Sequence, residues 1–346
     1  MARSAPLNAA ARGRRAIAAA ALERSGLGAL LRLAPGWRGL VVLNYHRIGM
    51  PGDSPLDRAM WNATPEDFDA QVGFLARNFD VISPDDVTAR PRGRQVLITF
   101  DDGYRDNHAA ALPILQAHGA TATFFLATGF LDAPRLAWWD EVAWMIRTSA
   151  RDSICVDGAG VAFDDQDRGA AVATVLDRAK ALPGAELGGF LDRVALATGT
   201  GRAPAPVSDG QWMTWRMARD LLGAGMHVGG HTVSHPILAR LHPAAQRAEI
   251  RGCAARLRAE LGIPMRWFSY PNGDRGSFDA QTRALLEEAG VELAFSFDGG
   301  FLRRGAPWDP YDVPRIGVGP RTAGDAFAAT VTLPHVFIRS MAGSRG

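Results

Sequence analysis

Short apolar runs alternate with segments of helical periodicity along most of the chain. Apolar residues recur at helical spacing after Thr64-Pro65-Glu66-Asp67 and after Thr214, and most clearly in Pro243–Leu261, which Gly262 ends. The runs that predict buried strands are Leu40–Tyr45, Val96–Phe100, Thr123–Leu126, Met226–Gly230, Trp267–Tyr270, Glu292–Phe297 and Val313–Val318. Because strands and helices alternate, the pattern predicts an α/β fold whose parallel sheet is closed, or nearly closed, into a barrel.

Residues 138–211 break this alternation, because their patterns are helical and rich in alanine. The helical segments are Asp140–Thr148, Gly169–Leu182 and Ala185–Thr198. A stretch with loop composition, Gly199–Gly210, follows them. We interpret 138–211 as a helical insertion within a catalytic domain of residues 40–320. It either covers the active-site face as a wall or lid, or decorates the periphery.

The two ends of the chain are predicted to be helical additions. Residues 1–39 are a helical extension in which the basic residues Arg3, Arg12, Arg14 and Arg15 precede the apolar run Ala16–Leu22. Because that run barely reaches the ~7–15 residues of a signal-peptide core, we favour a basic amphipathic helix. It either lies on an anionic membrane surface or packs on the domain. Residues 321–346 should form a C-terminal helix and tail. We expect a cytoplasmic protein, peripheral at the inner membrane face if the helix binds lipid, and secretion stays open.

The composition limits the partners of the protein. The 346 residues carry a net charge of only +2, which gives no electrostatic reason to expect a nucleic acid partner. Almost all of the positive charge is arginine, because Lys180 is the only lysine. Of the two cysteines, Cys155 and Cys253, the second falls in a helical pattern where a small buried thiol is expected.

Two polar motifs follow predicted strands and together indicate metal-dependent hydrolysis. Asp101 and Asp102 end one apolar run, and His231 and His235 follow another. A helical turn would place the two imidazoles on one side, because they are four residues apart. Two His and one Asp can hold a metal with a position open for water, and the second Asp can accept a proton. Since barrel active sites gather at the carboxyl ends of strands, we expect one site.

These motifs also resemble a known family. Thr99-Phe100-Asp101-Asp102-Gly103-Tyr104 is similar to the first motif of the polysaccharide deacetylases (carbohydrate esterase family 4), which include the nodulation-type chitooligosaccharide deacetylases. His231-Thr232-Val233-Ser234-His235 resembles their second motif. The resemblance implies a distorted, incomplete (β/α) barrel that removes acetyl groups from N-acetylated sugars of oligo- or polysaccharides. It also implies Asp101 as the base and a divalent metal, expected to be zinc, on Asp102, His231 and His235.

The resemblance suggests further site residues. It assigns the backbone amide of Tyr104 to the developing oxyanion. Tyr270-Pro271-Asn272-Gly273 is similar to a Tyr-Pro-x-Gly form of the third motif, so Tyr270, Pro271 and Asn272 are candidate substrate contacts. The arginine usual in this motif is missing. Arg315, in the last strand run, either orients Asp101 in its place or forms an ordinary salt bridge.

The general acid is the least defined residue. The last motif of the family supplies a His in Leu-x-His, but the final strand run has none. Leu333-Pro334-His335 fits the letters and follows a further helix, Ala323–Thr330. His46 ends the first strand run, where it either faces the pocket or is structural. We take His46 as the first candidate for the catalytic acid, with His335 or solvent next.

Three functions fit these patterns. The leading hypothesis is a metal-dependent carbohydrate deacetylase, and the second is a metal-dependent hydrolase of a small non-sugar amide. The third, motivated by the missing His, is a metal- or glycan-binding module without catalysis. An open groove with exposed aromatic residues would favour glycans, and a closed pocket would favour small amides. Trp138-Trp139 is either a sugar-stacking edge of that cleft or part of the core.

Overall fold

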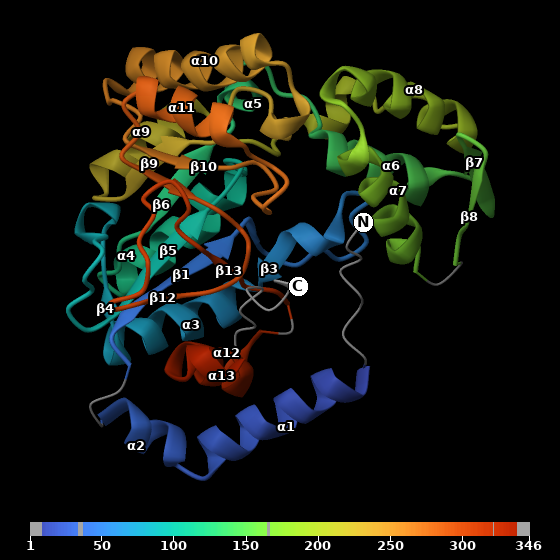
Figure 1. The fold of residues 1–346 in the computed structure, drawn as a ribbon. Coiled ribbons are helices and arrows are strands. Elements are labelled where there is room, and N and C mark those ends of the chain that lie inside the picture. The colour runs from blue at the N-terminus through green and yellow to red at the C-terminus, as the bar shows by residue number, and fades with distance from the viewer. Residues whose placement is uncertain (1–8, 34–36, 165–166, 321, 338–346) are drawn as a thin grey trace.

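A curled, mainly parallel sheet forms the centre of the molecule (Figure 1). The computed structural model describes residues 9–33, 37–164, 167–320 and 322–337. The strands of the sheet are β1 (Gly39–Tyr45), β4 (Asp80–Val81), β5 (Arg94–Phe100), β6 (Thr123–Leu126), β9 (His227–Gly230), β10 (Trp267–Ser269), β11 (Leu293–Phe295), β12 (Leu302–Arg303) and β13 (Ile316–Gly317). They run in the order β11-β10-β9-β6-β5-β1-β12, with β4 on β5 and β13 on β1. The seven predicted strand runs therefore all contribute to this sheet.

The last strand brings the two edges of the sheet together. Val313 pairs with Phe295 of β11, and Ile316 pairs with Leu43 of β1. The segment from 313 to 317 thus bridges the last and first strands of the parallel series. The pairing of β1 with β12 is antiparallel, whereas the other pairings of this sheet are parallel. The expected fold class, a distorted and incomplete (β/α) barrel, is confirmed.

Alternation along the strands divides the core into two faces. On β1, Val41 and Leu43 belong to the outer core, whereas Leu40 and Val42 pack with Phe125 on the inner face. The helices that cover the outer face are α3 (Pro65–Asn78), α4 (Leu112–Ala117), α9 (Trp215–Gly223), α10 (Pro243–Leu261), α11 (Ala280–Glu288) and α12 (Gly324–Thr332). Toward the carboxyl ends of the strands, the residues of the inner face become polar, and the site lies there.

Most predicted helix ends are confirmed by their caps. The Thr64 side chain accepts from the Asp67 amide, the Thr214 side chain accepts from the Met217 amide, and Gly262 ends α10 in the left-handed region. Asn107 is different, because it lies inside a π-helical turn (Asn107–Ala111) that precedes α4. Its side-chain amide donates to the His46 carbonyl at 2.7 Å, so it holds the segment after β1 and does not cap a helix.

The region 138–211 forms a unit beside the sheet (Figure 1) and packs around a second core cluster that also includes Tyr104, Ala127 and Phe130 of the barrel. Its elements are α6 (Trp138–Thr148), β7 (Ser153–Val156), β8 (Ala159–Ala162), α7 (Gly169–Ala181) and α8 (Leu187–Thr198). The β7–β8 hairpin was not predicted. Its turn is Asp157-Gly158 with φ values of 51° and 78°, and Asp-Gly between short alternating runs is a hairpin signal that the sequence does carry.

The N-terminal helices α1 (Ala9–Arg24) and α2 (Leu27–Leu33) lie against α12, next to α13 (Pro334–Phe337) (Figure 1). Arg32 donates to both Glu23 and the Thr332 side chain, and the Trp37 indole donates to the Thr332 carbonyl at 2.8 Å. Packing on the domain is thus one of the two arrangements expected for these helices. Arg3 and the tail from residue 338 lie outside the described residues. Among the helices described, none is both long and apolar enough to cross a membrane.

Candidate active site

Asp102, His231 and His235 converge at the carboxyl ends of β5 and β9. All three are buried, and the Asp102 Oδ1 atom lies 3.3 Å from Nε2 of His231 and 3.3 Å from Nε2 of His235. One ligand atom from each residue lies within 4.8 Å of the others. Atoms bound at ~2.0–2.2 Å around a tetrahedral centre are about 3.3–3.6 Å apart, so this spacing fits a metal such as zinc.

The hydrogen bonds of the three residues also fit a metal. Among the described residues, neither Asp102 oxygen nor Nδ1 of His235 has a hydrogen-bond partner, although all are buried. His231 Nδ1 lies 2.7 Å from the Ser269 carbonyl, which fixes the proton there and leaves the Nε2 lone pair free. Burial lowers the pKa of His235 to about 3, so its imidazole is neutral, as a ligand must be.

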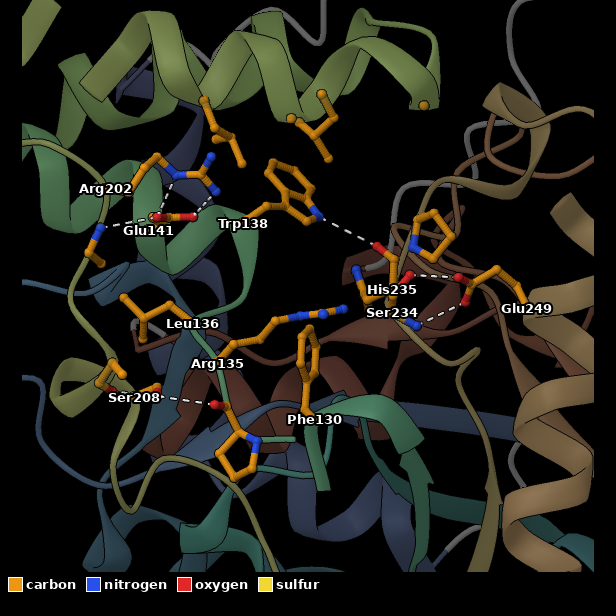
Figure 2. Close-up of a pocket in the computed structure, with 18 of the residues that line it drawn as sticks. Phe130, Arg135, Leu136, Trp138, Glu141, Arg202, Ser208, Ser234, His235 and Glu249 are labelled. Atoms are coloured by element: carbon orange, nitrogen blue, oxygen red, sulfur yellow. Dashed lines mark hydrogen bonds and ion pairs between the residues drawn. The ribbon is translucent and has the colours of Figure 1, made fainter. Parts of the chain in front are cut away.

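The loop that carries both histidines is not helical. Thr232 and His235 have positive φ values of 67° and 57°, and the expected helical turn is therefore wrong. Instead, Glu249 of α10 accepts from the Val233 amide at 2.8 Å and from the Ser234 amide and hydroxyl at 2.8 and 2.6 Å (Figure 2). Because left-handed backbone is costly for such residues, this carboxylate clamp holds a conformation that the loop would not adopt alone.

Asp101 is buried beside the metal ligands and paired with Arg315. The guanidinium donates from Nη1 to Oδ1 and from Nη2 to Oδ2, both at 2.8 Å. Asn44 and Ser269 also donate to Asp101, each at 3.2 Å, and both accept from Arg315. Burial raises the pKa of Asp101, but the charges of Arg315 and His231 outweigh it and hold that pKa well below its ordinary range. The structure therefore brings Arg315 to Asp101, as the sequence hypothesis required.

The Tyr104 side chain is structural, and its amide is free. The hydroxyl donates to Asp140 at 2.8 Å and accepts from the Trp139 indole at 2.8 Å. Tyr104 faces Trp212 in an antiparallel bridge whose hydrogen bonds belong to the flanking residues. In such a pair the amide points away from the partner strand. Among the described residues it donates no hydrogen bond, so it is available to a ligand.

A cavity of about 210 Å³ opens over these groups. It is lined by Asp101, Arg315 and the three candidate metal ligands, and His46 lies in the same lining. Of the expected substrate contacts, Tyr270 and Asn272 line it, whereas Pro271 is not among its lining residues. The Tyr270 hydroxyl donates to the Tyr311 carbonyl, so only its ring is presented. His335 is exposed on α13 and does not line this cavity.

Several residues of the site were missed by the sequence analysis. Asn44 and Ser269 are polar positions inside apolar strand runs, a signal that could have indicated inward-facing functional residues. Trp139 is buried and its ring lies edge-on, 4.3 Å from the His235 ring. Trp138 donates to the His235 carbonyl at 3.4 Å (Figure 2). It lines both this cavity and a larger one of about 760 Å³. The insertion therefore forms one wall of the site.

The family comparison agrees with this geometry. A family model described as polysaccharide deacetylase matches residues 88–151 and 193–294. The chain therefore contains a polysaccharide deacetylase domain. The match includes both aspartates and both histidines and leaves out residues 152–192.

The individual proteins that this chain resembles are distant in sequence. The Bacillus subtilis protein YxkH, which is named after the same family, is 31% identical over 94 residues, 25% of this chain. The chain therefore spans about a third of that relative's length (31%). The Streptococcus pyogenes deacetylase PplD has a TM-score of 0.57 at 17% identity, over 85% of this chain and 99% of that one. IcaB from Ammonifex degensii has a TM-score of 0.53 at 20% identity, over 85% and 97%. At these identities the structural likeness shows the shared fold.

Proposed function

We propose that this protein is a metal-dependent hydrolase that removes acetyl groups from N-acetylated sugars of an oligo- or polysaccharide. The observation that carries the proposal is the convergence of Asp102, His231 and His235 beside the Asp101–Arg315 pair. Hydrolysis of an amide at neutral pH requires a metal held by three protein ligands, with one coordination position open for water and a carboxylate beside it. Two histidine nitrogens and one aspartate oxygen provide such a set here. Zinc is the metal that we propose, because it prefers this donor set and geometry.

The residues would divide the chemistry between them. Bound to Asp102, His231 and His235, the metal would act as a Lewis acid on the acetamide carbonyl and make the attacking water acidic enough for a weak base. Asp101 takes the proton of that water, and Arg315 holds its carboxylate in place. The Tyr104 amide donates to the carbonyl oxygen as negative charge develops there.

The leaving amine needs a proton, and we propose that His46 supplies it. His46 lines the same cavity as Asp101 and His231. Its backbone is held on both sides, because its amide donates to the Asn62 side chain and its carbonyl accepts from Asn107. Its position is therefore fixed while the imidazole faces the cavity.

An acetate-release screen tests the proposal. Protein stripped with a chelator is assayed on N-acetylglucosamine oligomers with zinc, cobalt or manganese added back. We expect no acetate from the stripped protein and release after metal addition. If the reloaded protein releases no acetate from any N-acetylated sugar, the proposal fails, and the third hypothesis, a binding module without catalysis, takes its place.

The size of the cavity favours one second candidate, hydrolysis of a small non-sugar amide. At about 210 Å³ the cavity is smaller than the ~300–1,000 Å³ of typical ligand pockets, and the insertion covers one side of it. Trp139 and Tyr270 are buried, so they offer no long stacking edge for a glycan chain. Including small acetamides in the same screen distinguishes the two candidates.

We also propose that the N-terminal helices contact a membrane surface from the cytoplasmic side. Ile17 and Leu30 are 71% and 64% exposed, and Leu27 is also exposed, on the side of the molecule formed by α1 and α2. Arg24 is exposed nearby, so apolar side chains and positive charge occur together, as on helices that bind anionic lipid.

A further inference from the structure

Part of the catalytic cavity is built by a segment that the family match does not include. Residues 152–192 lie outside that match, and helix α7 lies within them. Leu176 and Lys180 of α7 line the catalytic cavity together with Asp101 and His231, and they also line a neighbouring cavity. The chain has therefore added a charged side chain of its own to a site whose metal-binding residues belong to the family motifs.

Lys180 is distinctive in composition and in its contacts. It is the only lysine in a chain with 38 lysine and arginine residues in total. Arg315, in the same cavity, directs its guanidinium to Asp101, Asn44 and Ser269. The Lys180 ammonium, in contrast, forms no hydrogen bond or ion pair with the residues that the structure describes, although the side chain is half-buried. Its three donors are therefore available to a ligand in the cavity.

An acceptor lies close to this donor. Asp57 lines the same cavity and is 8% exposed. Its amide donates to Asp140 at 2.9 Å, and one carboxylate oxygen accepts from the Ala59 amide at 3.1 Å, so the residue is fixed in place. Burial raises the pKa of Asp57, and the nearby positive charge of Lys180 lowers it. The two charged groups therefore lie close enough to interact electrostatically.

A neighbouring donor and acceptor of opposite charge suit one kind of ligand group. A sugar hydroxyl both donates and accepts, so a hydroxyl, or two adjacent ones, can satisfy both residues. An anionic substituent would be attracted by Lys180 but repelled by Asp57. A small amide without hydroxyls would leave both charged groups without partners in a confined cavity, which is unfavourable.

We infer that Lys180 and Asp57 bind the ring hydroxyls of a single neutral sugar residue whose acetamido group faces Asp101 and the metal-binding residues. This inference rests on the proposed function and narrows its substrate class. The cavity volume of about 210 Å³ has room for about one sugar ring, so the residue bound is a single sugar or the end of a chain. Lys180 is then a specificity-determining residue that the family motifs do not contain.

The test compares Lys180→Met, Lys180→Arg and a control, Asp177→Asn, in the full-length metal-loaded protein. Asp177 lies on the same helix and lines a neighbouring cavity, but not the catalytic one. The first measurement is the KM and kcat for acetate release from the best N-acetylglucosamine substrate. The second is the Kd of N-acetylglucosamine by calorimetry in an Asp101→Asn background, where no sugar is turned over.

Lys180→Met should raise both the Kd and the KM about ten- to hundredfold, as expected for loss of a charged hydrogen bond, with kcat changed much less. Lys180→Arg should recover most of the affinity, and Asp177→Asn should match the parent protein. Unchanged Kd and KM in Lys180→Met would overturn the inference, even if the parent enzyme releases acetate. Absence of acetate release from the parent enzyme would instead refute the proposed function, while the calorimetric comparison still decides the role of Lys180.

Discussion

Removing the Arg315 guanidinium should destabilise the protein strongly, because it would leave a buried carboxylate without its cation. Asp101 is 3% exposed and Arg315 is 1% exposed, and two hydrogen bonds of 2.8 Å join them. Breaking a buried ion pair by removing one partner costs about 3–5 kcal/mol. Arg315→Met also leaves Asn44 and Ser269 without the donor that they share, so we expect the upper part of that range.

The loss should depend on pH in a defined direction. The pKa of Asp101 is lower in the folded protein than the ~3.9 of an unfolded chain. The pair therefore contributes stability that is fully present above about pH 4 and is lost as the pH falls toward the folded pKa. In Arg315→Met, burial raises the pKa of Asp101, so its protonation in acid relieves the penalty. The difference in stability between the parent and the variant should be largest near pH 7, and it should shrink as the pH falls through the raised pKa of Asp101 in the variant toward the lowered pKa in the parent.

Urea unfolding, followed by far-UV circular dichroism in the presence of a chelator, measures both effects without a contribution from metal binding. Arg315→Lys is the matched variant, because it keeps the charge and loses the two-pronged geometry, and it should lose less stability. The double variant with Asp101→Asn should be less destabilised than the sum of the two single changes. This reasoning would be refuted if Arg315→Met lowered the free energy of unfolding by less than about 1 kcal/mol, or by an amount that does not depend on pH.

Further predictions concern the site and the N-terminal surface. Asp101→Asn should abolish turnover and keep the metal content near the parent value, whereas Asp102→Asn should lower the metal content as well. Atomic emission measures the metal content, and equal metal loss in the two variants would contradict our assignments. His46→Ala should remove the alkaline limb of the pH–rate profile and keep the metal, and an unchanged profile would exclude it as the acid. Glu249→Ala should weaken metal binding about 10–100-fold in chelator competition; unchanged affinity would contradict the clamp. Leu30→Glu should reduce cosedimentation of the protein with anionic vesicles. Equal cosedimentation of the variant and the parent would contradict lipid binding by these helices.

The barrel could be predicted from the sequence because each of its strands is a short apolar run with a separate helix after it. The two-residue strands β4 and β12 were missed, since so few residues carry no periodic signal. The hairpin in the insertion was hidden by the alanine-rich helical segments around it. Pairing of Val313 with Phe295, which brings the edges of the sheet together, is a contact between distant runs that no local pattern specifies.

For the site, the sequence identified side chains whose chemistry is unusual at the ends of strands, such as adjacent aspartates and a histidine pair. It could not give the conformation of the histidine loop, because Glu249 on a separate helix determines it. Nor could it place Lys180 or Asp57 at the site, because neither residue belongs to a recognisable motif. Lys180 reaches the cavity only because the insertion packs against the barrel, whereas Asp57 comes from the segment between β1 and α3.

The position of Arg315 near the end of the chain determines the order in which the parts of the site become available during synthesis. Asp101 and Arg315 are separated by 214 positions, and all three metal-binding side chains precede Arg315. When His235 has emerged from the ribosome, the growing chain already contains all three candidate metal ligands, while Asp101 still lacks the Arg315 cation. Domains generally fold as units during synthesis, and here the unit is completed only when the segment around Val313 docks between β1 and β11. On the proposed function, metal binding can therefore precede catalytic competence, and we expect activity only after the segment around Val313 has docked.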